Sequence, residues 1–195
     1  MDYDAFAESL RLIESRQVEP VLRLSRDRRF APMALDVADD VAVTMFARRG
    51  VGCVWSDTHV LSRRDGQWRL LGGSRGTADD ELLAPRPARL PDYLAHVPVA
   101  IPGIDPRVMV TGGGGGVRDS QGGTGRWPWS GRWISYVVLR VSAEVASLAV
   151  DGRELVVPWH GRVVIASVKR RPSVVTVYDR EGRVLGEGRP QAPRV

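Results

Sequence analysis

Cysteine is almost absent from this sequence. Cys53 is the only one among 195 residues, so the chain has no partner cysteine for an internal disulfide. Its three histidines are His59, His96 and His160, and they are scattered too widely for the ligand spacing of a zinc site. We therefore expect no disulfide framework, no bound metal and no cofactor, and we interpret His160, which precedes Gly161, as a loop residue.

Long apolar runs are also missing. No stretch approaches the roughly 20 apolar residues that a membrane-spanning helix needs. The N-terminus, Met1-Asp2-Tyr3-Asp4, is acidic where a signal peptide has a basic region followed by an apolar one. We expect a cytoplasmic protein that does not contact a membrane.

Lysine is also almost absent, although arginine is abundant. Of 28 basic residues, Lys169 is the only lysine, an imbalance that is typical of a bacterial chain from a GC-rich genome. Residues 1–84 carry a net charge of −2 and residues 85–195 carry +7. The basic part favours an anionic partner such as phosphate, nucleic acid or an acidic protein surface. The simpler interpretation is that the two parts have differently charged solvated faces.

The first 84 residues contain signals for both helix and strand. Tyr3, Phe6, Leu10 and Ile13 recur at the spacing of one helix face. Pro20 is suited to the first position of a second short helix, which the basic cluster at residues 26–29 would end.

The pattern then changes to the alternation of strands, at residues 41–46, 53–61 and 68–71. Asp65-Gly66 favours a two-residue hairpin turn, which would place Leu61 opposite Leu70 and Arg63 opposite Trp68. We predict a small α+β unit at residues 1–84, in which one or two helices pack on a three-stranded antiparallel meander.

Nearly half of the 13 prolines lie between residues 85 and 106. The segment also carries apolar side chains that would anchor it to the surface: Tyr93, Leu94, Val97, Val99, Ile101 and Ile104. We predict that residues 85–106 form an ordered connector between two parts of the chain.

The remaining residues, 107–195, are typical of a mainly-β domain. Seven short strands are predicted, at residues 108–111, 133–141, 145–150, 154–158, 163–168, 174–178 and 183–186. Asp151-Gly152 and Glu181-Gly182 supply turns between them. This pattern resembles that of an immunoglobulin-like antiparallel β-sandwich, although the cysteine and tryptophan marks of antibody domains are absent.

Two segments of the β domain are candidate sites. The run Gly112–Gly116 follows a strand, but it lacks the lysine and the following helix of a phosphate loop, so a flexible or bulged stretch between strands is the simpler interpretation. The segment 126–133 holds three of six tryptophans interleaved with arginines. Its candidate binding residues are Arg126, Trp127, Trp129, Arg132 and Trp133. Such residues anchor protein interfaces and also stack on bases or sugars, while half-buried tryptophans covering the end of the sandwich are the structural alternative.

A third candidate lies in the N-terminal part. Alternation places Trp55, Asp57 and His59 on one face of a strand, where Asp57 would orient His59 as a general base. The stretch at residues 65–71, Asp-Gly-Gln-Trp-Arg-Leu-Leu, resembles a strand of the nuclear-transport-factor-2-like family. That resemblance implies a helix and a curved sheet whose concave face holds the chemistry. An exposed strand end is the simpler interpretation of the same residues.

No catalytic signature stands out, so the first hypothesis is a non-enzymatic protein that engages a macromolecular partner through the Trp/Arg segment. A protein partner is expected first, with nucleic acid or sugar as lesser alternatives. The second hypothesis is a small-molecule enzyme or binder with a cavity on the face of Trp55, Asp57 and His59.

Overall fold

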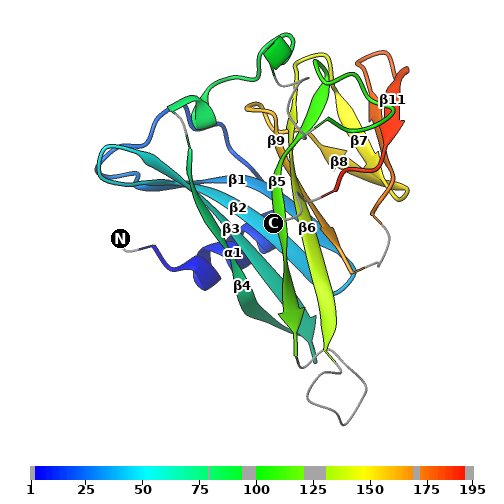
Figure 1. Cartoon of the computed structure of the whole chain (residues 1–195). Helices are drawn as coiled ribbons and strands as arrows, with labels where there is room; N and C mark the ends of the chain where they lie inside the picture. Colours follow the sequence, from blue (N-terminus) through cyan, green and yellow to red (C-terminus); the bar gives the residue numbers. More distant parts are fainter. Residues whose placement is uncertain (1–2, 79, 94–99, 121–130, 169–171, 192–195) are drawn as a thin grey trace.

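Antiparallel β-sheet makes up most of the described part of the chain, which also contains one α-helix (Figure 1). This computed structural model describes residues 3–78, 80–93, 100–120, 131–168 and 172–191. The described strands form three sheets, which we call sheets A, B and C in chain order of their first strands.

The helix α1 (Ala5–Ser15) begins at Asp4, whose Oδ1 accepts hydrogen bonds from the backbone N–H groups of Phe6 and Ala7. Its buried face differs from the predicted one, because Phe6 is 36% exposed whereas Ser9, Leu12 and Ile13 are buried. Within the described residues, no helix has the length and apolar character needed to cross a membrane.

A polar contact accounts for the orientation of α1. The Ser9 hydroxyl lies 2.8 Å from Thr44 Oγ1 in a buried hydrogen bond between the helix and sheet A. The spacing of apolar residues carries no information about such a hydrogen bond. The predicted apolar face of the helix is therefore rotated relative to the face that packs on sheet A.

Sheet A is a four-stranded meander, one strand more than predicted, in the order β1 (Phe30–Ala38), β2 (Val41–Arg49), β3 (Val54–Arg64) and β4 (Gln67–Ala78). The Asp65-Gly66 turn has positive φ at both residues (50° and 78°), as its turn type requires. The predicted pairs Leu61–Leu70 and Arg63–Trp68 are confirmed by the register.

Sheets B and C come from the second part of the chain. Sheet B has the order β5 (Met109–Asp119), β6 (Arg132–Val141) and β9 (Arg162–Ser167). Sheet C has the order β11 (Val184–Gly188), β10 (Val175–Tyr178), β7 (Ser147–Val150) and β8 (Arg153–Val156). These seven strands lie close to the seven predicted ones, since each prediction overlaps one of them.

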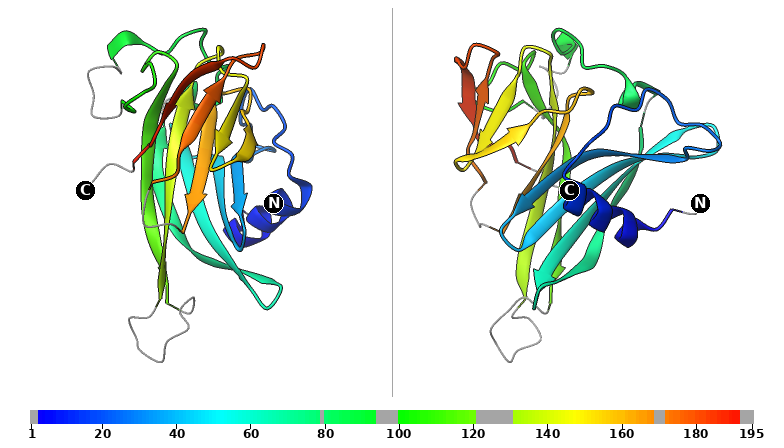
Figure 2. Two further views of the ribbon diagram at one scale, coloured as in Figure 1. Left: turned by 90° about the vertical axis from the view of Figure 1, so that its right-hand side faces the viewer. Right: turned by 180° about the vertical axis from the view of Figure 1, so that it is seen from behind.

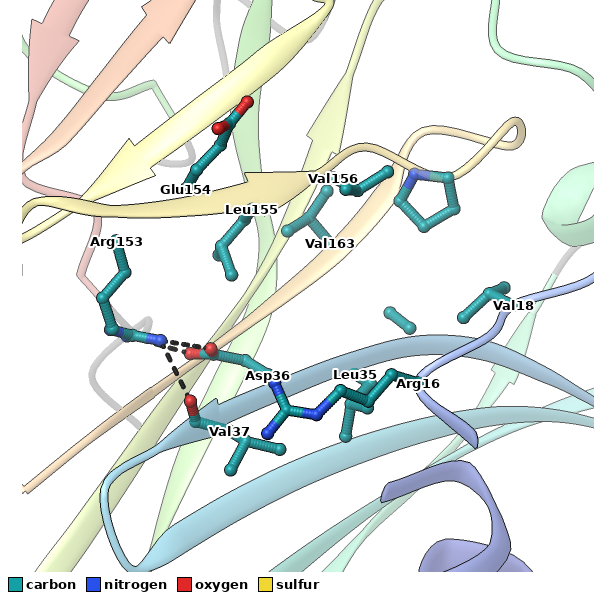
Figure 3. A pocket seen from close by; sticks show the side chains of 12 residues that line it. Arg16, Val18, Leu35, Asp36, Val37, Arg153, Glu154, Leu155, Val156 and Val163 are labelled. Atoms are coloured by element: carbon teal, nitrogen blue, oxygen red, sulfur yellow. Dashed lines mark hydrogen bonds and ion pairs between the residues drawn. The ribbon is translucent and has the colours of Figure 1, made fainter. Parts of the chain in front are cut away.

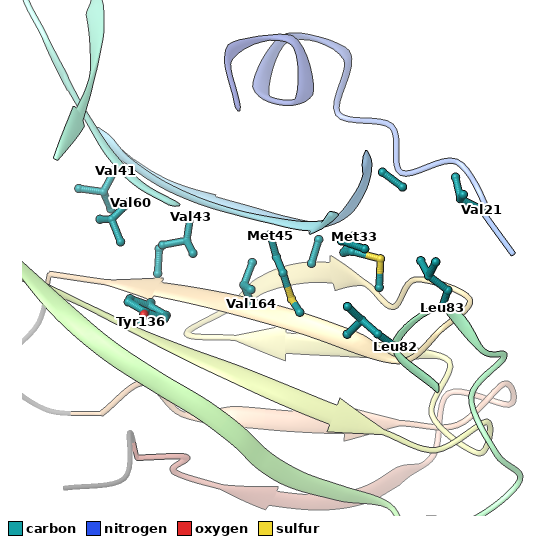
Figure 4. Close-up of a cluster of buried hydrophobic side chains, with 14 of the residues drawn as sticks. Val21, Met33, Val41, Val43, Met45, Val60, Leu82, Leu83, Tyr136 and Val164 are labelled. Atoms are coloured by element: carbon teal, nitrogen blue, oxygen red, sulfur yellow. The ribbon is translucent and has the colours of Figure 1, made fainter. Parts of the chain in front are cut away.

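The layers stack in the order α1, sheet A, sheet B, sheet C (Figure 2). One face of sheet A packs on sheet B through a cluster that includes Val43, Met45, Ile134 and Tyr136 (Figure 4). The opposite face of sheet B packs on sheet C through a second cluster, which includes Leu139 and Leu148. Alternate side chains of β6 therefore pack into two different cores, one between sheets A and B and one between sheets B and C.

Two predictions about irregular segments are corrected. Residues 16–29 have no helix, so the second helix predicted from Pro20 is wrong, and Val21 and Leu24 are buried in extended chain instead. The run Gly112–Gly116 is not a loop but lies within β5, which continues to Asp119 with a bulge between Thr111 and Gly113.

Between η1 (Asp80–Leu83), a short 3₁₀ helix, and β5, the connector is anchored by a few side chains. Leu90, Ile101 and Ile104 are buried, and Ala100 pairs with Val110. Tyr93 was predicted as an anchor but is 63% exposed. Leu94, Val97 and Val99 lie outside the described residues, and the division of the chain at residues 84 and 107 stays a prediction.

Candidate functional site

The end of sheet B that is farthest from sheet C holds the described part of the Trp/Arg segment. Trp133 follows the first residue of β6 and is 60% exposed. Arg132 is half-buried and forms ion pairs with Asp40 at 2.6 Å and with Asp119 at 3.4 Å. Arg126, Trp127 and Trp129 lie outside the described residues. The two described members of the segment therefore differ in role, because Arg132 ties sheet B to the β1–β2 turn while Trp133 faces solvent.

The Trp133 ring is held against a glycine of the neighbouring strand. A Cβ atom built on Gly116 would lie closer to the indole Nε1 than van der Waals contact allows, so the ring lies over the bare backbone there. Arg118 is exposed and pairs directly with Trp133 across the two strands, which puts both side chains on one face of the sheet. We call Trp133 and Arg118 the Trp133 surface.

The second candidate face, that of Trp55, Asp57 and His59, lies on the side of sheet A that α1 covers. Asp57 is 1% exposed, and its two carboxylate oxygens accept hydrogen bonds from Arg48 (2.9 Å) and Arg75 (2.8 Å). Arg75 also lies over the Trp55 ring, 5.9 Å from its centroid. The carboxylate is thus engaged by two arginines from the neighbouring strands β2 and β4.

His59 has a different partner, Tyr3. The Tyr3 hydroxyl lies 2.6 Å from His59 Nε2, and the Tyr3 ring packs on Phe30 and Phe46. Burial lowers the pKa of His59 despite the opposing effect of Asp57, and burial together with Asp57 raises the pKa of Tyr3. Both groups are therefore neutral at physiological pH. The structure brings Asp57 and His59 to one face but gives each of them another hydrogen-bond partner.

A groove of about 390 Å³ separates β1 from β8 (Figure 3). Figure 3 shows Arg153 of β8 reaching Asp36 and the Val37 carbonyl of β1, with Leu155 and Val18 along the walls. Asp36 is 1% exposed and also accepts a 2.8 Å hydrogen bond from the backbone N–H of Ala166 in β9. This carboxylate therefore touches all three sheets, which indicates a structural role.

A second cavity, of about 420 Å³, lies between sheets A and B on the opposite side of β3 from Asp57. We call it the intersheet cleft. Its lining includes Ser74 of β4, Tyr136 and Arg140 of β6, Arg162 of β9 and the residues 112–114 of the glycine run. The sequence reasoning missed this cleft. The one sequence feature that pointed to it was the glycine run. We interpreted that run as a flexible or bulged stretch because it does not match a phosphate loop.

Two further findings concern metal ligands and similar proteins. Across the described part of the chain, no group of three or more His, Cys, Asp or Glu side chains is placed to hold a metal ion. No protein-family model, curated protein or solved structure matches this chain. Any assignment of function therefore depends on the geometry of the sites themselves.

Proposed function

We propose that this chain is a non-enzymatic binding protein that engages another protein through the Trp133 surface. The observation that supports it is that Trp133 is 60% exposed while its ring lies against the backbone of Gly116. A large aromatic side chain held in one orientation loses little conformational entropy on binding, so more of its contact energy stabilises the complex. Tryptophan and arginine are also the commonest anchors of protein interfaces.

The local charge favours a protein over a nucleic acid. Arg132 is next to Trp133, but its guanidinium is ion-paired with Asp40 and Asp119. A surface that binds a phosphate backbone gains affinity from arginines whose charge is not already balanced. Asp40 and Asp119 lower the affinity that Arg132 would contribute to phosphate binding. A protein partner that covers the indole does not depend on that contribution.

The strand order supports an immunoglobulin-like classification of residues 107–195 as part of this proposal. Lettered A to G in chain order, the seven strands form one sheet A-B-E and a second sheet G-F-C-D. Antibody constant domains have the same neighbours, except that strand D lies on the other sheet. Sandwiches of this kind include many binding domains, but a fold alone does not define a partner.

The first experiment is affinity capture from a nuclease-treated lysate of the native host, with the wild-type chain and Trp133→Ala as baits. Truncation of an anchoring tryptophan costs about 2 kcal/mol or more of binding free energy, which is roughly a 30-fold loss of affinity. We therefore expect a discrete protein that the wild type retains at high salt and that Trp133→Ala does not retain.

Leu22→Ala provides the matched control, because Leu22 is an apolar side chain that is 73% exposed on another segment. It should capture the same protein as the wild type, and circular dichroism should show all three baits to be folded. Equal capture by Trp133→Ala and the wild type would contradict the proposal. Capture that disappears with salt, together with nucleic acid in the eluate of a parallel capture from untreated lysate, would point to a nucleic-acid partner instead.

The alternative function, acid–base chemistry on the face of Trp55, Asp57 and His59, has no specific observation in its favour. A general base needs a carboxylate or imidazole within reach of the substrate proton. Here Asp57 is bound by Arg48 and Arg75, and His59 is bound by Tyr3. These contacts favour a structural role for the face, in which it anchors the residues before α1 to sheet A.

A further inference from the structure

The intersheet cleft lies where the outer strands of two sheets come together. β4 is the last strand of sheet A and β5 is the first strand of sheet B, and they lie side by side (Figure 1). Each of them has a single neighbouring strand in its sheet. On the outer edge of β5 the described residues give one bridge, between Ala100 and Val110, and the glycine run at residues 112–116 lies beyond it. Such edges present N–H groups that a ligand can use.

Glycines keep this cleft open. Residues 112–114 of β5 and Gly76 of β4 line it without side chains. A Cβ atom built on Gly76 or on Gly113 would meet no other atom within 4 Å, so each glycine borders empty space. The cleft volume of about 420 Å³ lies within the range of small-molecule sites.

The polar side chains of the cleft favour an anion. Arg140 and Arg162 are direct partners across β6 and β9, and both line the cleft. Like charges directly opposite each other destabilise a sheet, and an anion between them would offset that repulsion. Both arginines also interact within the protein, so a ligand would share them. Among the lining residues that the structure describes there is no aspartate or glutamate.

Hydroxyl groups line the same cleft as the arginines. The Tyr136 hydroxyl donates a 2.7 Å hydrogen bond to Ser74 Oγ, which joins sheet B to sheet A across the cleft. The Ser74 hydroxyl keeps its own proton to donate to a ligand, and Ser56 lies on the same wall. Hydroxyl, guanidinium and backbone N–H groups are all donors, which is the complement that an oxyanion requires.

We propose that the intersheet cleft binds a small organic molecule through a compact oxyanion group, phosphate or carboxylate. The oxyanion lies between Arg140 and Arg162 and the remainder of the molecule extends along the glycine-lined edge of β5. This site is separate from the Trp133 surface, since the two share no residue, and either proposal can fail without the other.

The test is isothermal titration calorimetry at neutral pH and matched ionic strength, with inorganic phosphate and with citrate as probes. The two key variants are Arg162→Gln, which removes one guanidinium, and Gly76→Leu, which fills the cleft without removing a polar group. We expect the wild type to bind at least one probe and Arg162→Gln to bind it about tenfold or more weakly, the loss typical of a charge-assisted contact. Gly76→Leu should also bind it about tenfold or more weakly, because its side chain occupies space in the cleft. A preference for phosphate or for citrate identifies the oxyanion class.

Arg107→Gln serves as the matched control, because Arg107 is 52% exposed and lies outside the cleft. It should bind like the wild type. Equal affinities in all four proteins, or no heat from either probe up to about 50 mM with the wild type, would overturn the proposal. If Arg162→Gln does not fold, Gly76→Leu decides alone, and circular dichroism identifies which variants are folded.

Discussion

At the scale of single residues, His160 couples the stability of the fold to pH. It is 5% exposed, its Nε2 lies 2.8 Å from the Met33 carbonyl, and its Nδ1 accepts a 3.0 Å hydrogen bond from the backbone N–H of Arg162. An Nδ1 that accepts must carry no proton, so Nε2 donates to Met33 and the ring is neutral. Burial first, and then the charges of Arg162 and Arg86, lower the pKa of His160 to about 4.

We expect acid to destabilise the protein through this residue. The unfolded chain takes up a proton near pH 6.5, while the folded chain keeps His160 neutral until about pH 4, so falling pH favours the unfolded state across this window. The full difference is about 3 kcal/mol at 1.4 kcal/mol per pH unit. Urea unfolding at about pH 7 and about pH 4.5 measures most of it.

The comparison for His160 is His160→Gln, which cannot titrate. The pH dependence of its unfolding free energy should be smaller than that of the wild type, and the other titrating groups, His59 and Asp179 among them, are present in both proteins. An identical pH dependence in the two proteins would contradict the assignment to His160.

Residue-level predictions from the sequence succeeded where a local rule applies. The Asp65-Gly66 turn and its pairs Leu61–Leu70 and Arg63–Trp68 follow from turn chemistry and are confirmed. His160 was interpreted as a loop residue, and it does lie in a turn, but its burial depends on Met33, which is 127 positions away in the chain. A partner at that separation leaves no local pattern to find.

At the scale of elements, the glycine strand β5 is explained by its neighbour β6. A Cβ atom on Gly115 would lie 2.9 Å from the Tyr136 hydroxyl, and one on Gly116 would fall inside the Trp133 ring contact. The two aromatic rings therefore occupy the space that side chains on β5 would fill. A glycine run in a sequence suggests a loop because glycine weakens strands. The register between β5 and β6 is needed to see that the glycines make room for the two aromatic rings.

Gly116→Val should destabilise the protein because the new side chain displaces the Trp133 indole. Overpacking of this kind costs about 1–3 kcal/mol, and the displaced ring should shift the tryptophan fluorescence. Gly76→Ala is the control, since its Cβ meets no atom within 4 Å. Chemical denaturation compares the two, and a Gly116→Val protein as stable as Gly76→Ala would contradict the packing described here.

At the scale of the whole molecule, sheet B stabilises two cores at once. Its Tyr136 side packs on sheet A and its Leu139 side packs on sheet C. The sequence predicted most strands of both parts, since alternation and turns are local, but it could not predict this stack. The pattern of β6 is apolar on both faces, and which sheet covers each face is decided by contacts between distant segments.

Asp36 is the polar link in that stack. It accepts hydrogen bonds from Ala166 of sheet B and from Arg153 of sheet C, both across large distances in sequence. Asp36→Ala should cost about 3 kcal/mol of unfolding free energy, because it leaves a buried N–H and a guanidinium without their acceptor. Asp40→Ala is the control, since Asp40 is 46% exposed. Guanidinium denaturation measures both, and equal small losses would contradict the link.

The measurement that tests the proposed function most directly is site-specific photo-crosslinking in the native host. A photoreactive phenylalanine analogue is placed at position 120, beside the start of β6, or, as the control, at position 22; Ser120 and Leu22 are both exposed, and Trp133 stays in place. We expect a discrete protein adduct from position 120 that is lost when Trp133→Ala is added and that position 22 does not give. Position 120 without any protein adduct, in a chain that is folded and expressed, would contradict the proposed function.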